Sequence, residues 1–133
     1  MSKPVRAYLV DDNDIDLIVN DKLLRISNIT EDIRKFNSGE EFLQSLKDLK
    51  DCDQYLNVLL LDIMMPGMTG FETAEVLFRE FPKQAACFQV YVLSSSIDRH
   101  DIQRAQAIPG VRRVLEKPLD TYLLKGLLKE MGG

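Results

Sequence analysis

The chain reads Tyr55-Leu-Asn-Val-Leu-Leu-Leu61 at its most apolar stretch, and this run ends abruptly at Asp62. Its brevity and β-favouring ends predict a central strand of a parallel sheet, because strands covered on both faces read as continuous apolar runs. Parallel strands need crossover connections, so helices are expected on both sides of this stretch.

Four more apolar runs predict strands at residues 5–10, 33–36, 88–93 and 111–115, and segments with helical spacing separate them. Two helix starts carry the residue pair of a capping box, Ser38 with Glu41 and Thr69 with Glu72. The β-α order repeats five times, which predicts an α/β domain with a doubly wound, five-stranded parallel sheet. In such folds ligands bind beyond the carboxyl ends of the strands.

The first and last helices have the clearest apolar stripes. For the first helix, the spacing predicts an inward face of Ile15, Ile18, Val19, Leu23 and Ile26. For the last helix, it predicts an inward face of Leu119, Leu123, Leu127 and Met131.

Composition narrows the class of protein. The 133 residues are 45% hydrophobic and 29% charged, and no Gly-, Pro- or Ser-rich linker divides them. We therefore expect residues 1–133 to form one domain without a separate output domain. The formal net charge of −4 disfavours direct nucleic-acid binding. Neither a membrane-spanning run nor a signal peptide is present, so membrane insertion is not expected and the protein is predicted to be cytoplasmic.

The two cysteines offer no recognisable motif. Cys52 and Cys87 have neither a C-x-x-C spacing nor enough further cysteines for a zinc site. Because a cytoplasmic protein is expected, both are predicted to be ordinary reduced thiols.

The predicted strands end in groups suited to a metal ion or a phosphate. Asp11 and Asp12 follow the first strand, Asp62 the third, Ser94 the fourth, and the fifth runs on to Lys117. Three carboxylates at one edge of a sheet repel each other unless a cation offsets their charge. Mg²⁺ is the cation expected, because it is a hard ion that prefers oxygen ligands.

Four motifs at these strand ends resemble those of a response-regulator receiver domain. They are Leu9-Val-Asp-Asp-Asn13, Leu59-Leu-Leu-Asp-Ile-Met-Met-Pro-Gly-Met-Thr-Gly-Phe-Glu72, Val92-Leu-Ser-Ser95 and Leu115-Glu-Lys-Pro118. The resemblance covers essentially the whole chain and is to a stand-alone receiver of the chemotaxis-regulator kind. It implies the (βα)5 flavodoxin-like receiver fold.

The resemblance also implies a chemical role for the acidic residues. Asp62 is implied to be the phosphoacceptor of a two-component phosphorelay, taking a phosphoryl group from a phosphohistidine of a sensor histidine kinase or a histidine phosphotransfer protein. Asp12 and Asp62 are implied to bind Mg²⁺ through their side chains, Met64 through its backbone carbonyl, and Asp11 through water.

Other site residues follow from the same resemblance. Lys117 is implied to pair with Asp62 and then with the phosphoryl oxygens, and Pro118 to be a cis-proline that orients it. Ser94 is implied to be the switch hydroxyl, although Ser94 to Ser96 could instead cap the next helix. Val114 departs from the family, which often has an aromatic residue there, so output is expected to depend on backbone and loop movement.

Two surfaces are candidate docking sites for proteins. One is the start of the first helix, with Asp14, Ile15 and Ile18, although spacing favours a core position for Ile18. The other is by resemblance the output or homodimer face of the fourth helix, fifth strand and last helix. Its basic residues are Arg99, Arg104 and Arg113, which are equally compatible with an ordinary solvated face.

The expected function is a phosphoacceptor signalling domain, with self-catalysed phosphotransfer and autodephosphorylation as its only chemistry. Its phosphorylated state would change binding to a downstream protein or pass the phosphate onward. One alternative is a receiver-like interaction module that is never phosphorylated. Another is a metal-dependent aspartyl phosphatase, for which Asp12-Asn-Asp14 has the right spacing but Asp16 stands where that motif needs Thr or Val.

Overall fold

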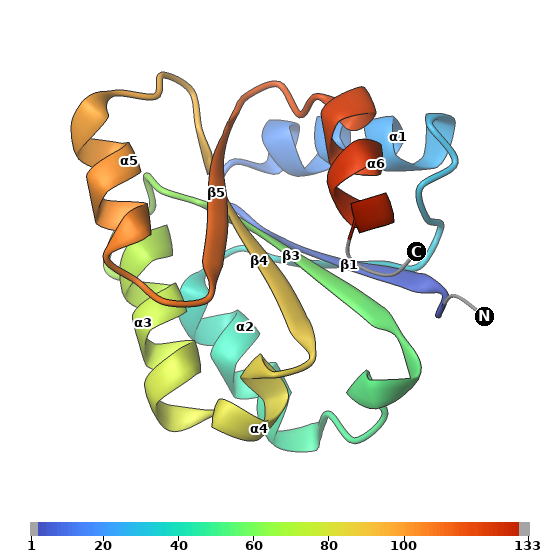
Figure 1. Ribbon diagram of the computed structural model, residues 1–133, viewed down its shortest axis with the longest axis horizontal. Coiled ribbons are helices and arrows are strands. Elements are labelled where there is room, and N and C mark those ends of the chain that lie inside the picture. Colours follow the sequence, from blue (N-terminus) through green and yellow to red (C-terminus); the bar gives the residue numbers. More distant parts are fainter. Residues whose placement is uncertain (1–2, 131–133) are drawn as a thin grey trace.

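The structure, a computed structural model, describes residues 3–130 and contains one five-stranded parallel sheet (Figure 1). The strands are β1 (Val5–Val10), β2 (Ile33–Phe36), β3 (Leu56–Asp62), β4 (Phe88–Ser94) and β5 (Val111–Glu116). Their order in the sheet is β2-β1-β3-β4-β5, and all pairs are parallel. The predicted doubly wound sheet is confirmed, with the apolar run at residues 55–61 at its centre.

Within residues 3–130, six α-helices connect and cover the strands. They are α1 (Asp14–Ile26), α2 (Gly39–Ser45), α3 (Gly70–Glu80), α4 (Pro82–Ala85), α5 (Arg99–Gln106) and α6 (Thr121–Glu130). Short 3₁₀ helices occupy Leu46–Asp48 and Cys52–Gln54. The single turn α4 was not predicted, and it begins at a proline, which a first helical position tolerates. Within residues 3–130 no helix is both long and apolar enough to cross a lipid bilayer.

The sheet separates two apolar cores. Figure 1 shows α2, α3 and α5 on one face of the sheet and α1 and α6 on the other. Leu59 and Leu61 of β3 belong to one core, whereas Val58 and Leu60 belong to the other. This alternation is why β3 reads as a continuous apolar run. On α6, Leu124 and Leu128 are buried, and Leu123 and Leu127 pack partly against the same core. Met131, which the stripe was predicted to include, lies outside the described residues.

The buried face of α1 differs from the prediction. Leu17 and Leu24 enter the core, together with the polar residues Asn20 and Asp21. Four of the five residues predicted to face inward are exposed: Ile15 (70%), Ile18 (51%), Val19 (39%) and Ile26 (77%). The spacing of apolar residues predicted the wrong inward face because a polar residue occupies an inward position. Asp21 is buried there in ion pairs with Lys35 and Arg25.

The prediction of two free thiols was wrong, because Cys52 and Cys87 form a disulfide. They are separated by 35 residues, but their Cα atoms lie 5.9 Å apart. The sheet brings them together, since Asn57 at the start of β3 pairs with Phe88 at the start of β4. The disulfide therefore joins two connections at the amino-terminal edge of the sheet.

A buried arginine strengthens the same edge. Arg6 is 2% exposed, and its guanidinium donates hydrogen bonds to both carboxylate oxygens of Asp51 and to Asp32. It also stacks on the ring of Tyr55, 3.5 Å from the ring centroid. Such planar, two-pronged pairing suits arginine and fixes the connections before β2 and β3.

Candidate functional site

The carboxyl ends of β1 and β3 place three aspartates together. Val10 pairs with Leu61, so Asp11 and Asp62 follow at neighbouring positions of adjacent strands. Oxygen atoms from Asp11, Asp12 and Asp62 all lie within 4.8 Å of one another. Asp11 and Asp62 are buried and Asp12 is exposed. The predicted gathering of these three carboxylates is therefore present in the structure.

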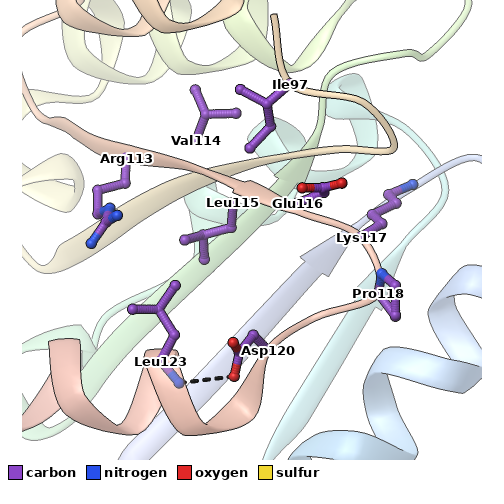
Figure 2. A pocket seen from close by; sticks show the side chains of 9 residues that line it. All are labelled: Ile97, Arg113, Val114, Leu115, Glu116, Lys117, Pro118, Asp120 and Leu123. Carbon is purple, nitrogen blue, oxygen red and sulfur yellow. Dashed lines mark hydrogen bonds between the residues drawn. The ribbon is translucent and has the colours of Figure 1, made fainter.

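Lys117 is the cation among these carboxylates. Its Nζ lies 2.9 Å from Asp11 Oδ2, 3.0 Å from Asp62 Oδ1 and 2.9 Å from Asp16 Oδ2. Its backbone N–H donates to the carbonyl of Ser94 at 2.8 Å, which ties it to the end of β4. Figure 2 shows Lys117 directly after β5, followed by Pro118, and the bond between them is cis, as the resemblance implied.

Asp16 is a site residue that the sequence reasoning missed. Its carboxylate contacts Lys117 from the first turn of α1. The Asn13 side chain caps that turn by accepting from the N–H groups of Ile15 and Asp16. A helix cap at Asn13 predicts that Asp16, three residues later, lies in the first turn of the helix. This was the signal for Asp16 that the sequence offered.

Burial and charge shift two pKa values at the site. Burial raises the pKa of Asp62 to about 6, helped by the negative charge of Asp11, although the hydrogen bond from Lys117 works in the opposite direction. Burial disfavours the charged form of Lys117, but hydrogen bonds to Asp11, Asp16 and Asp62 outweigh it and raise the Lys117 pKa. The ammonium is therefore charged across the physiological range.

The loop after Asp62 returns closely to the strand end. The N–H of Gly70 donates to the carbonyl of Ile63 at 3.3 Å, and a Cβ at Gly70 would lie 2.4 Å from the Asp62 carbonyl oxygen. Only glycine allows this approach. The predicted capping box of Thr69 and Glu72 is confirmed at the start of α3. Met64 sits in this loop with its side chain 75% exposed.

Ser94 lies at the end of β4 and is buried. Its hydroxyl donates to the Ser96 carbonyl at 2.9 Å and accepts from the Ser96 N–H at 3.2 Å. The alternative in which Ser94 to Ser96 cap the next helix is wrong, because Asp98 caps α5 in a capping box with Asp101. The Ser94 hydroxyl instead holds the start of the loop that leads to α5.

A cavity of about 540 Å³ opens over the carboxylates. Its lining includes Asp12, Asp16, Val19, Asp62, Met64 and Lys117. A second hollow of about 470 Å³ follows β5, where Val114 lies beside Ile97 and Leu115 beside Leu123 (Figure 2). Asp12, Asp62 and Lys117 thus share the first cavity, and the second runs along β5, the strand that precedes Lys117.

The basic residues of the predicted output face are not equivalent. Arg99 and Arg113 are exposed. Arg104 instead pairs with Glu75 of α3 at 3.0 Å, and its guanidinium lies over the ring of Phe71, 5.3 Å from the centroid. Arg104 therefore serves to pack α5 against α3.

Asp14 does not join the carboxylate cluster. Its Oδ1 accepts a hydrogen bond from Asn37 Nδ2 at 3.0 Å. The aspartyl phosphatase alternative requires Asp12 and Asp14 to act together, so this arrangement does not favour it.

Comparison with known proteins agrees with this geometry. The model of the response regulator receiver domain matches residues 7–129. The two-component response regulator ARR6 of Arabidopsis thaliana is 28% identical over 128 residues, a match covering 92% of this chain and 62% of that protein. This chain spans about half to three fifths of the length of the first curated relatives it matches.

Solved structures have the same fold. A response regulator receiver protein from Dyadobacter fermentans superposes with a TM-score of 0.87 at 34% identity, covering 95% of this chain and 96% of that one. The receiver domain of Ssk1 from Saccharomyces cerevisiae, solved in complex with the histidine phosphotransfer protein Ypd1, has a TM-score of 0.75 at 21% identity, covering 99% of this chain and 91% of that one. The family match, the parallel sheet and the aspartates at its carboxyl edge lead to one conclusion: this chain belongs to the response regulator receiver domains of two-component signalling.

Proposed function

We propose that Asp62 is the phosphoacceptor of this receiver domain and takes its phosphoryl group from a phosphohistidine. The observation that supports this most strongly is the buried Asp62 carboxylate, 3.0 Å from the Lys117 ammonium and open to a cavity of about 540 Å³. A buried acid with a shifted pKa, in a cavity and beside a cation, has the features of a reactive group.

The transfer forms an O–P bond at the Asp62 carboxylate and breaks the N–P bond of the phosphohistidine. The electron pair of the broken bond stays on the imidazole nitrogen. A carboxylate attacks an anionic phosphoryl group poorly unless positive charge offsets the repulsion. Lys117 supplies part of this charge at Asp62, and its compact ammonium can also donate to phosphoryl oxygens.

A magnesium ion fits the donor set of the site. Asp11, Asp12 and Asp62 bring oxygens within 4.8 Å of one another, and carboxylate oxygens are ligands that Mg²⁺ prefers. Asp12 and Asp62 would hold the ion through their side chains, Asp11 through water, and Met64 through its backbone carbonyl. When bound, the ion neutralises charge that develops on the phosphoryl oxygens.

The phosphorylated state is proposed to act through the loop that begins at Ser94. Reorientation of the Ser94 hydroxyl toward a phosphoryl group breaks its two hydrogen bonds with Ser96 and so releases this loop. Val114 offers no aromatic ring to couple to this movement, so loop and backbone displacement carry the change. The result is altered binding of a downstream protein or transfer of the phosphate onward.

Replacing Asp62 with asparagine is expected to abolish phosphorylation. Wild-type protein incubated with acetyl phosphate and Mg²⁺ should give a shifted band in phosphate-affinity electrophoresis, and Asp62→Asn should give none. Asp53→Asn is the matched control, because Asp53 is exposed at the opposite edge of the sheet. A wild-type protein that took up no phosphate from acetyl phosphate or from a phosphohistidine protein would support the unphosphorylated interaction module instead.

The exposed face of α1 is the proposed docking site for the phosphohistidine donor. Ile15 and Ile18 are exposed there, and Val19 and Met64 line the cavity over Asp62. An apolar patch beside the reacting carboxylate suits the apolar side of a partner helix. The complex of Ypd1 with the Ssk1 receiver domain supports a histidine phosphotransfer protein as the kind of partner, with a sensor histidine kinase as the other donor of this chemistry.

Replacing Ile18 with asparagine should slow transfer from a protein donor about tenfold, because the docked donor protein covers this side chain. The reaction with acetyl phosphate should be unchanged, because so small a donor does not cover Ile18. The comparison uses a phosphorylated histidine phosphotransfer protein, with Ypd1 as first choice, and follows loss of phosphate from the donor. Ile26→Asn is the control on the same helix, since Ile26 is 77% exposed at its far end. Equal slowing by both variants would argue against docking at the start of α1.

A further inference from the structure

The ammonium group of Lys117 already has three carboxylate partners: it donates hydrogen bonds to Asp11 and Asp16 and forms an ion pair with Asp62. It has three N–H groups, and three carboxylates lie within 3.0 Å of Nζ: Asp11, Asp16 and Asp62. A phosphoryl group on Asp62 adds oxygens that need the same donors. Phosphorylation replaces the single charge of the Asp62 carboxylate with the larger charge of a phosphoryl group. Asp11 and Asp16 then compete with the phosphoryl oxygens for the Lys117 ammonium.

Burial identifies the partner that is released most easily. The side chains of Asp11 and Asp62 are 3% and 7% exposed, whereas that of Asp16 is 37% exposed. Asp11 also accepts a hydrogen bond from the N–H of Asn13 at 2.9 Å. An exposed carboxylate regains water when its ion pair breaks, but a buried one does not. Exchange at Asp16 is therefore the least unfavourable of the three.

The backbone holds Asp16 where this exchange is needed. Its N–H is capped by Asn13, and its carboxylate lines the same cavity as Asp12 and Asp62. It stands outside the proposed magnesium ligands, so its direct contact at the site is with Lys117. A fourth carboxylate in this position draws the ammonium away from an incoming phosphoryl group.

We propose that Asp16 is a positioning residue that holds Lys117 in the unphosphorylated protein and gives it up when Asp62 is phosphorylated. Asp16 thereby stabilises the unphosphorylated form and slows phosphorylation. This inference rests on the proposed function, since it needs a phosphoryl group at Asp62. Asp16 acts through its ion pair with Lys117 and does not itself contact the phosphorus atom.

The test measures the rate of phosphorylation by acetyl phosphate with Mg²⁺, using phosphate-affinity electrophoresis. Asp16→Asn is expected to accelerate the reaction about two- to fivefold, the size expected for a half-exposed ion pair. Asp16→Glu, which keeps the charge, should restore most of the wild-type rate. Asp53→Asn removes the same charge at the opposite edge and should leave the rate unchanged.

A double-mutant cycle shows whether Asp16 acts through Lys117. In a Lys117→Met background, slower overall, Asp16→Asn should give no acceleration, because the exchanged partner is gone. Equal acceleration by Asp16→Asn in both backgrounds, or no acceleration by Asp16→Asn in the wild-type background, would overturn the inference. The same gels include Asp62→Asn as the unphosphorylated reference. A wild-type protein that took up no phosphate from acetyl phosphate or from a phosphohistidine protein would refute the proposed function itself and the inference with it.

Discussion

Replacing Asp62 with asparagine is expected to make the metal-free protein more stable at pH 7.5 by about 3 kcal/mol, because the wild-type fold buries an ionised carboxyl whose pKa is raised. Removing a charged side chain from a protein usually removes stabilising contacts. Here Lys117 keeps Asp11 and Asp16 as partners, while the repulsion between Asp11 and Asp62 disappears. The residue proposed to carry the function is thus expected to oppose folding.

The pH dependence follows from the direction of the shift. Burial raises the pKa of Asp62 from 3.8 to about 6, so the folded protein binds this proton more tightly than the unfolded chain. At a pH below both values the carboxyl has no effect on stability. As the pH rises through this window the unfolded chain ionises first, and the free energy of unfolding falls by about 3 kcal/mol before it levels off above pH 7.

Urea denaturation in EDTA between pH 4 and pH 8 checks this expectation. Asp62→Asn should lack the fall in unfolding free energy that the wild type shows between about pH 4 and pH 7. Asp53→Asn serves as the control for net charge, and Mg²⁺ should recover much of the wild-type loss at pH 7.5. An asparagine variant that is less stable than the wild type at pH 7.5 would contradict the argument.

Replacing Lys117 with methionine should have the opposite effect and destabilise the metal-free protein at pH 7.5 by about 3 kcal/mol, since breaking a buried ion pair leaves its partner uncompensated. The variant retains Asp11 and Asp62 in buried positions without their shared cation. Protonation of Asp62 relieves this repulsion, so the loss should shrink as the pH is lowered toward 5. Added Mg²⁺ should also reduce it.

The matched control is Lys125→Met, because Lys125 is exposed on α6. Both variants lose one positive charge and gain the same side chain, so their difference in urea midpoint reports the site alone. Equal midpoints at pH 7.5 would show that Lys117 does not compensate the buried carboxylates. Asp62→Asn is expected to raise the free energy of unfolding and Lys117→Met to lower it. Measuring both variants is therefore more informative than measuring either one alone.

Local patterns were sufficient for the strands and for the carboxylate cluster. β1 and β2 have the predicted ends, and the apolar run of residues 55–61 became the central strand. Parallel strands present their carboxyl ends on one edge, so adjacency in sequence to a strand end was enough to bring Asp11 and Asp62 together.

Features that depend on distant partners could not be predicted. The orientation of α1 depends on Lys35, a β2 residue that stabilises Asp21 in a buried position. The disulfide depends on the spatial neighbourhood of β3 and β4, which the 35-residue separation of Cys52 and Cys87 conceals. The contact between Asp16 and Lys117 spans 101 residues, and neither side chain signals the other in the sequence.

The two edges of the sheet differ in energetic frustration. At the amino-terminal edge, the Cys52–Cys87 disulfide and the ion pairs of Arg6 all favour the same arrangement. At the carboxyl edge, four carboxylates compete for the ammonium of Lys117 or repel one another. Proteins concentrate such conflicts where they respond to ligands, and consistent contacts elsewhere preserve the fold. The disulfide and the Arg6 ion pairs therefore cross-link the amino-terminal edge, so we expect any rearrangement on phosphorylation to occur at the carboxyl edge.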